Sequence, residues 1–294
     1  MRLVSFDGGR RAGVRAGDRV HDTGMNMLEL LSEWPRVRER FASPDGAGVP
    51  LRDLKLSAPV PQPPKIVCIG QNYLDHVREQ DAQLPERPVI FAKFRTAVVG
   101  PGEPVWWPEG VTETVDWEVE LAVVIGARAR DVSRDRAASV IAGYTIGNDV
   151  SARDVQLKLG GGQWVRGKSL DSFCPLGPEI VTEDELGDPG SLRLWLDLNG
   201  TRMQDSTTSN LIFGVPELIE FCSRSFTLEP GDVLLTGTPP GVGAFRQPPV
   251  FLKAGDRMVA GIDGIGRLES PVRGPVPASG LIRPATSGSE RRPT

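Results

Sequence analysis

The chain has 294 residues, 39% of them hydrophobic and 24% charged, a composition typical of a soluble globular protein with one large and one small domain. Its formal net charge is −4 with both signs interspersed, so the sequence lacks the basic patch of a nucleic-acid-binding protein and predicts no nucleic-acid partner. It has no apolar run of membrane-spanning length, no apolar core of a signal peptide and three scattered cysteines, so we expect a cytoplasmic protein with no membrane partner.

Residues 1–58 are predicted to form a small N-terminal α+β domain. Short apolar runs alternate with Gly and Asp turns in RLVSFDGGRRAGVRAGDRV, which is typical of a meander of short strands. Residues 26–41 have the pattern of a helix, which Pro35 is expected to break. Four prolines within residues 58–65 make a stiff segment that we interpret as the domain boundary.

Residues 59–274 are predicted to form a larger, strand-rich domain. Runs such as KIVCIG, ELAVVIG and GDVLLTGTP are short, β-branched and bounded by Gly, Asp or Pro. We expect one helix between an N-cap at Ser133 and a stop at Gly143, and another over residues 215–226. Strands without regular βαβ alternation predict an α+β fold, mostly β, that is rolled or barrel-like. Residues 275–294 are rich in Pro, Ser and charge and are expected to be disordered.

Two carboxylates, Glu118 and Glu120, interrupt the apolar strand pattern of VDWEVELAVVIG. Side chains two positions apart on a strand share a face, so these two are expected to lie ~7 Å apart along it. They could form the solvent face of an edge strand, but the segment continues into LAVVIG, which is apolar on both faces. A third acid, Asp149, follows a strand in GYTIGNDVSARD. Three hard oxygen ligands with no His or Cys nearby predict a site for Mg²⁺, Mn²⁺ or Ca²⁺.

His76 and Glu79 stand three positions apart in NYLDHVREQ, so a helix would place them on one face, with Asn72 as its N-cap. The carboxylate could then orient the imidazole as a base that activates water, and a surface His–Glu pair is the alternative. Because so short a helix is marginal by itself, we hypothesise that residues 71–85 form a lid ordered by substrate.

Six segments over residues 60–272 resemble successive blocks of the fumarylacetoacetate hydrolase family: IGQNYLDHVREQ, DWEVELAVVIG, GYTIGNDVSARDVQ, GKSLDSFCPLGP, NGTRMQDSTTSNLIF and GDVLLTGTPPGVG. The resemblance implies a mixed β-roll, a homodimer, and a Mg²⁺ or Mn²⁺ ion, with Ca²⁺ in some members. It does not make Asp116 a metal ligand. The matching positions imply metal ligands Glu118, Glu120 and Asp149, catalytic residues His76, Glu79 and Lys168, and substrate contacts Arg153, Gln156 and Thr238, with Lys93 as a weaker contact.

Three of these assignments have structural alternatives. Lys168 could be solvated, Arg153 could be held in a structural pair by Asp154, and Thr238 could belong to an ordinary tight turn.

The resemblance implies a divalent-metal-dependent hydrolase that cleaves a C–C bond of an acylpyruvate-like or 1,3-diketo acid through a metal-bound enolate. His76 and Glu79 would activate water, and the small-molecule partner would be a keto acid. The same site could instead decarboxylate oxaloacetate or isomerise a hydroxy-diene-dioate, because all three reactions share the enolate. A non-catalytic paralogue is a weaker alternative, since no expected ligand is missing from the sequence.

Overall fold

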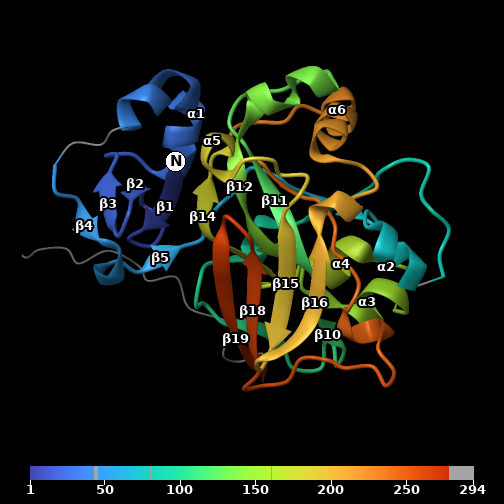
Figure 1. The fold of residues 1–294 in the computed structure, drawn as a ribbon. Coiled ribbons are helices and arrows are strands. Elements are labelled where there is room, and N and C mark those ends of the chain that lie inside the picture. The colour runs from blue at the N-terminus through green and yellow to red at the C-terminus, as the bar shows by residue number, and fades with distance from the viewer. Residues whose placement is uncertain (43–45, 80, 160, 278–294) are drawn as a thin grey trace, which may run out of the picture.

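A mixed sheet of 12 strands runs through the computed structural model, which describes residues 1–42, 46–79, 81–159 and 161–277 (Figure 1). Its main path runs in space through β4 (Val49–Pro50), β3 (Arg19–Asp22), β2 (Arg11–Ala16), β1 (Arg2–Phe6), β14 (Cys174–Val181), β12 (Ile141–Asn148), β11 (Val119–Ile125), β17 (Val233–Leu235), β6 (Ile66–Gly70) and β7 (Val89–Lys93). Two short strands join at the side, β5 (Leu56–Ser57) on β1 and β8 (Val98–Val99) on β14.

A second sheet lies against the middle of the first, through contacts of its strands with β11, β12 and β14. Its order is β16 (Thr201–Thr207), β15 (Arg193–Leu198), β18 (Arg257–Ile262), β19 (Gly266–Val276) and β9 (Val105–Pro108), and a separate pair is formed by β10 (Val115–Asp116) and β13 (Ser151–Ala152). Every residue of β11 is buried, because β12 and β17 flank it within its sheet and the second sheet contacts it. The predicted fold, mostly β with mixed strand directions, is confirmed.

The helices are short and lie around the sheets. They are α1 (Met27–Val37), α2 (Leu74–Glu79), α3 (Arg153–Leu157), α4 (Trp164–Lys168), α5 (Glu183–Leu186) and α6 (Val215–Ser225), with 3₁₀ turns at Arg38–Phe41, Leu51–Asp53, Arg95–Ala97, Arg134–Val140, Thr208–Asn210 and Gly243–Phe245. Figure 1 shows α2, α3 and α4 together at one side of the molecule, opposite the N-terminal strands. The helix predicted over residues 215–226 is confirmed as α6. None of the described helices is both long and apolar enough to cross a membrane.

The predicted break at Pro35 is wrong, because α1 continues through it to Val37. A capping box between Asn26 and Glu29 fixes the start of α1, and its buried face, which includes Trp34, holds the helix against the core. This packing outweighs the one hydrogen bond that a proline removes near the end of a helix.

The helix predicted between Ser133 and Gly143 is also wrong in type and end point. Ser133 precedes a 3₁₀ turn without capping it, and Gly143 lies inside β12. A Cβ on Gly143 would lie 2.5 Å from the backbone oxygen of Val181, so this glycine permits the close approach of β12 to β14 rather than ending a helix.

The N-terminal strands continue the main sheet. β1 pairs antiparallel with β14, where Arg2 faces Val181, so residues on both sides of the predicted boundary at residue 58 share one sheet. The division into two domains stays a prediction. The predicted disordered tail begins too early, because residues 275 and 276 belong to β19, and its part from residue 278 onward lies outside the described residues.

Replacing Gly143 with alanine is expected to lower the free energy of unfolding by about 1–3 kcal/mol, because the new Cβ would force β12 away from β14. Urea denaturation followed by tryptophan fluorescence measures the loss. Gly214→Ala is the matched control, since its Cβ would meet Pro216 at an ordinary 3.9 Å and its φ of −70° is open to any residue. Equal unfolding midpoints for the Gly143 variant and the unaltered protein would contradict this tight approach.

Candidate active site

Three buried carboxylates converge at the start of β11. Glu120 lies in β11, Glu118 precedes that strand, and Asp149 directly follows β12. The register of β11 with β12 places Val119 opposite Asn148, and the backbone N–H of Asp149 donates to the backbone oxygen of Glu118 at 2.8 Å. One carboxylate oxygen from each acid lies within 4.8 Å of the others. The structure thus brings together the three side chains that the sequence predicts as metal ligands, while Asp116 lies outside this cluster.

Two buried lysines compensate part of this negative charge. The ammonium of Lys168 donates to Glu118 Oε2 at 2.9 Å, to Asp149 Oδ2 at 2.7 Å and to Ser151 Oγ at 2.8 Å. The ammonium of Lys93 donates to Asp149 Oδ1 at 2.5 Å and to the backbone oxygen of Val150 at 3.2 Å. The alternative of a solvated Lys168 is therefore wrong, because its side chain is only 3% exposed.

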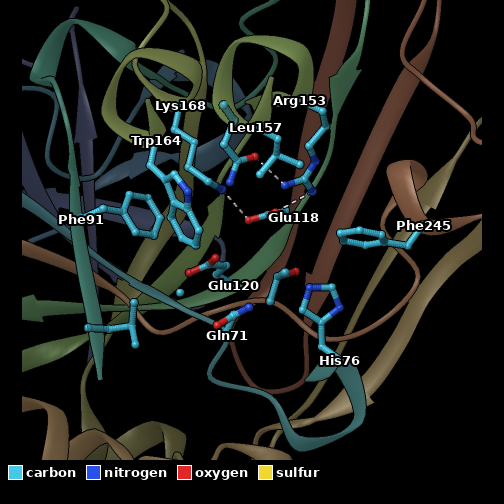
Figure 2. Close-up of a pocket in the computed structure, with 14 residues that line it drawn as sticks. Gln71, His76, Phe91, Glu118, Glu120, Arg153, Leu157, Trp164, Lys168 and Phe245 are labelled. Atoms are coloured by element: carbon cyan, nitrogen blue, oxygen red, sulfur yellow. Dashed lines mark hydrogen bonds and ion pairs between the residues drawn. The ribbon is translucent and has the colours of Figure 1, made fainter. Parts of the chain in front are cut away.

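The three acids do not share the available positive charge equally. Burial alone would raise the pKa of Glu118, but Lys168 and Arg153 lower it to about 2. Burial raises the pKa of Glu120, and the charges of Asp149 and Glu118 raise it further. Glu120 accepts a hydrogen bond from the backbone N–H of Gly237 at 2.7 Å, whereas Lys168 and Arg153 point toward Glu118 (Figure 2).

This imbalance fits a bound divalent cation. Glu118, Glu120 and Asp149 offer only hard oxygen donors, and Glu120 is the acid for which a further positive charge would offset the cost of burial. These are the ligand types that suit Mg²⁺ and Mn²⁺.

His76 and Glu79 meet at one side of this cluster, on α2. Nδ1 of His76 lies 2.9 Å from Glu79 Oε2, and the other oxygen of Glu79 accepts from the backbone N–H of Gly241 at 3.0 Å. Because the carboxylate of Glu79 can only accept, this contact requires the proton on Nδ1, and a neutral imidazole then has its lone pair on Nε2. Phe245 packs edge-on against the imidazole with ring centroids 5.9 Å apart. The predicted orientation of the imidazole by Glu79 is therefore present.

The predicted N-cap at Asn72 is wrong. Its amide donates to the backbone oxygens of Phe213 at 3.0 Å and Thr236 at 2.8 Å, and it accepts from the N–H of Phe213, so it joins three distant segments. Asp75 anchors α2 through a hydrogen bond from Ser206 at 2.6 Å. These contacts hold the start of the predicted lid, and its ordering by substrate stays a hypothesis.

Arg153 joins the carboxylates to the substrate-side residues. Its Nη2 lies 2.6 Å from Glu118 Oε1, its Nε donates to Asp116 Oδ2 at 2.8 Å, and its Nη1 donates to Gln156 at 3.0 Å. The proposed structural pair with Asp154 is wrong, because the carboxylate of Asp154 accepts from Thr112 and nearby backbone N–H groups.

Thr238 is held by the protein through its hydroxyl. Its Oγ1 donates to the backbone oxygen of Val119 at 3.0 Å and accepts from Gln204 at 2.8 Å. It nevertheless lines the cavity described next.

A cavity of about 110 Å³ opens between these groups. It is lined by predicted site residues His76, Glu118, Glu120, Arg153, Gln156, Lys168 and Thr238, together with Ile69, Gly70, Gln71, Phe91, Leu157, Trp164 and Phe245 (Figure 2). Lys93 is not among these described lining residues, because its side chain is fully buried and pairs with Asp149. The prediction that it contacts substrate is therefore wrong.

The apolar and amide walls of this cavity were not predicted from the sequence. Phe91 and Trp164 pack edge-on with ring centroids 5.4 Å apart, so a strand and a helix form one wall jointly. A signal was available for Trp164, because it stands four positions before Lys168 and a helical turn places such residues on one face. No comparable pattern marks Gln71 or Phe245.

This chain is similar to known proteins over most of its length. A profile of the fumarylacetoacetate (FAA) hydrolase C-terminal family matches residues 65–273. The protein named oxaloacetate tautomerase fahd2, mitochondrial, from Xenopus laevis is 43% identical over 92% of this chain and 90% of its own. A putative HpcE protein from Mycobacterium smegmatis has a TM-score of 0.87 and 40% identity, covering 93% of this chain and 99% of its own. Maleylpyruvate hydrolase from Sphingobium sp. SYK-6, solved with manganese(II) and pyruvate, has a TM-score of 0.79 and 35% identity over 94% of this chain and 100% of its own.

Replacing Lys93 with methionine is expected to lower the free energy of unfolding by about 3–5 kcal/mol, because Asp149 loses a buried positive partner. A divalent cation would supply the missing charge, so Mn²⁺ should raise the melting temperature of this variant strongly. Differential scanning calorimetry with and without Mn²⁺ measures both effects.

Lys65→Met is the control for that experiment. Its ammonium pairs with the buried Asp232 at 2.6 Å, away from the carboxylate cluster, so Mn²⁺ should not restore the stability lost there. Because the Lys65 variant keeps the carboxylate cluster, Mn²⁺ should raise its melting temperature only as much as that of the unaltered protein. A Mn²⁺ shift in the Lys93 variant no larger than this would contradict replacement of the Lys93 charge by the cation.

Proposed function

Because this chain belongs to the fumarylacetoacetate hydrolase family, we propose that it is an isomerase that moves a proton between carbon and oxygen in a small 2-oxo diacid such as oxaloacetate. The observation that carries the proposal is a His–Glu pair facing a buried cluster of carboxylates and cations across one small cavity. The proposal departs from the hydrolysis implied by the motifs and follows the alternative of isomerisation, with a 2-oxo diacid in place of the hydroxy-diene-dioate. Its support is the high identity to a relative named oxaloacetate tautomerase over most of both chains.

Glu118, Glu120 and Asp149 would hold a Mg²⁺ or Mn²⁺ ion. Such an ion, when bound, polarises a carbonyl oxygen and stabilises negative charge that develops on it. The manganese(II) in the related Sphingobium hydrolase supports a divalent ion as the cofactor of this chain.

Two cations of the chain would stabilise the negative charge of the substrate through their own charge. Burial alone would lower the pKa of Lys168, but Asp149 and Glu118 raise it, so its ammonium stays charged. The guanidinium of Arg153 lines the same cavity and is always charged. Both are placed to stabilise an anionic substrate and the negative oxygen of its enolate form.

His76 would move the proton. With its Nδ1 proton directed to Glu79, the lone pair on Nε2 can accept a proton from the carbon next to the carbonyl group. Glu79 stabilises the imidazolium that results, and its second hydrogen bond to Gly241 fixes its own orientation. The edge of Phe245 restricts the ring further.

The size of the cavity favours a small substrate. Its volume of about 110 Å³ is well below the roughly 300–1,000 Å³ of pockets that hold drug-sized ligands. A short diacid would place a carboxylate near Arg153 and its carbonyl group near the carboxylate cluster.

Hydrolysis of an acylpyruvate is the second candidate function. The His76–Glu79 pair could equally activate a water molecule, and a structural relative is a maleylpyruvate hydrolase. Faster cleavage of acetylpyruvate than tautomerisation of oxaloacetate, in a side-by-side assay with Mg²⁺, would favour hydrolysis.

We also propose the homodimer implied by the family and a cytoplasmic location. The homodimer is supported by β7, which ends the main path of the large sheet and carries exposed apolar side chains at Val89 and Ile90, followed by the exposed Phe94.

Replacing His76 with alanine is expected to lower kcat for oxaloacetate tautomerisation by about 10²–10⁴-fold, because the group that accepts the proton is removed. Ultraviolet absorbance of the enol form, corrected for the spontaneous rate, measures this with Mg²⁺ or Mn²⁺ present. EDTA should abolish turnover of the unaltered protein, and either ion should restore it.

His21→Ala is the matched control, because His21 is the only other histidine and lies on β3, outside the cavity lining. It should keep full activity. Unchanged tautomerisation in the His76 variant would contradict its assigned role.

A further inference from the structure

We propose that Asp116 is a positioning residue that fastens two walls of the candidate active site to one carboxylate: Arg153 on one side and the loop of residues 241–246 on the other. The side chain of Asp116 is fully buried, and it accepts four hydrogen bonds. Oδ1 accepts from the backbone N–H of Gly243 at 2.6 Å and of Trp117 at 2.8 Å. Oδ2 accepts from the N–H of Ala244 at 3.0 Å and from Nε of Arg153 at 2.8 Å.

On the first wall, Asp116 fixes the direction of a substrate-binding cation. The guanidinium is held from behind at Nε, while Nη1 reaches Gln156 and Nη2 reaches Glu118. A guanidinium is planar, so fixing Nε on one edge sets where the other two nitrogens point. Without Asp116, Arg153 would keep its charge but lose its fixed orientation toward the cavity.

On the second wall, Asp116 fixes the loop that contacts the histidine. A Cβ on Gly243 would lie 1.9 Å from the backbone oxygen of Val250 and 2.8 Å from Asp116 Oδ1, so glycine is needed for the loop backbone to pack between these two groups. The same loop presents Phe245 to His76 and donates from the N–H of Gly241 to Glu79. The carboxylate therefore orders the surroundings of the histidine as well as the arginine.

Asp116 itself does not line the cavity, so its effect must pass through these neighbours. If it acts through Arg153, loss of either residue should weaken anion binding, and loss of both should cost little more than loss of Arg153 alone. If it acts through the loop, its loss should also slow turnover. The inference rests on the proposed function for the meaning of turnover, but not for anion binding.

The test is a double-mutant cycle on the holoprotein, with oxalate as the anion and Mn²⁺ present. Isothermal titration calorimetry gives the oxalate affinity of the unaltered protein, Asp116→Asn, Arg153→Gln and the double variant. We expect Asp116→Asn and Arg153→Gln each to weaken oxalate binding about tenfold or more, with the double variant within about threefold of Arg153→Gln. If the fold-losses of oxalate affinity in the two single variants multiply in the double variant, Asp116 does not act through Arg153, and this part of the proposal is overturned.

The effect of Asp116 through the loop of residues 241–246 is tested by measuring kcat and KM for oxaloacetate separately. Arg153→Gln should mainly raise KM, Phe245→Ala should mainly lower kcat, and Asp116→Asn should do both. An Asp116→Asn variant that loses melting temperature alone, with oxalate affinity and kcat unchanged, would reduce Asp116 to a stabilising residue and overturn the proposal.

Two further variants keep the result interpretable. Glu179→Gln removes another buried carboxylate, which accepts from Arg2 at 2.7 Å and Arg15 at 2.8 Å outside the cavity lining, so it should lower stability and leave oxalate affinity unchanged. If Asp116→Asn does not fold, Asp116→Glu keeps the charge and displaces the carboxylate, and the same cycle applies. Coupled oxalate binding without tautomerisation would refute the proposed function alone, whereas tautomerisation with independent oxalate losses would refute this inference alone.

Discussion

The site depends on one electrostatic constraint: three carboxylates are buried within a few ångströms of one another beside a fully packed strand. Burial and mutual repulsion both oppose their ionisation. Lys93, Lys168 and Arg153 contact Asp149 and Glu118. Burial and the charges of Asp149 and Glu118 nevertheless raise the pKa of Glu120, and Lys168 offsets only part of this. The remaining imbalance is why a divalent cation fits this place, and why an anionic substrate would find two cations already held in position.

The carboxylate cluster could be proposed from the sequence because two of its acids stand in an apolar strand segment, where charged residues are rare. Glu118 and Glu120 stand in a segment that continues apolar on both faces, and His76 and Glu79 have helical spacing. These local patterns proposed the site, but a solvent-facing strand and a surface His–Glu pair stayed open until the family motifs favoured the site. Lys93 was misassigned because its match to a family position places it near the site but does not show on which side of Asp149 it lies. Asn72 has the residue type of an N-cap, yet its amide is used by segments more than a hundred positions away, which no local pattern contains.

The fold shows the same division between local and distant information. Periodicity located α6 and the buried β11, because each buries a face set by its own sequence. Gly143 was misread because the reason for a glycine there is the backbone of Val181, in a strand that follows much later. The sequence could not separate the three related reactions for a similar reason. The acids and the histidine suit all three, and the cavity walls come from residues such as Phe91 and Phe245, which belong to no motif.

The pairing of β1 with β14 also affects how the chain can be made. Arg2 pairs with Val181, so the first strand leaves the ribosome long before β14, its neighbour at this end, has been made. At ~5–20 residues per second this delay is roughly 10–35 s, and the exposed edge of β1 is open to wrong partners during that time. Pairing across so long a stretch of chain also slows folding. The end of β1 at Arg2 and Leu3 is therefore open to association with wrong partners until β14 has been made.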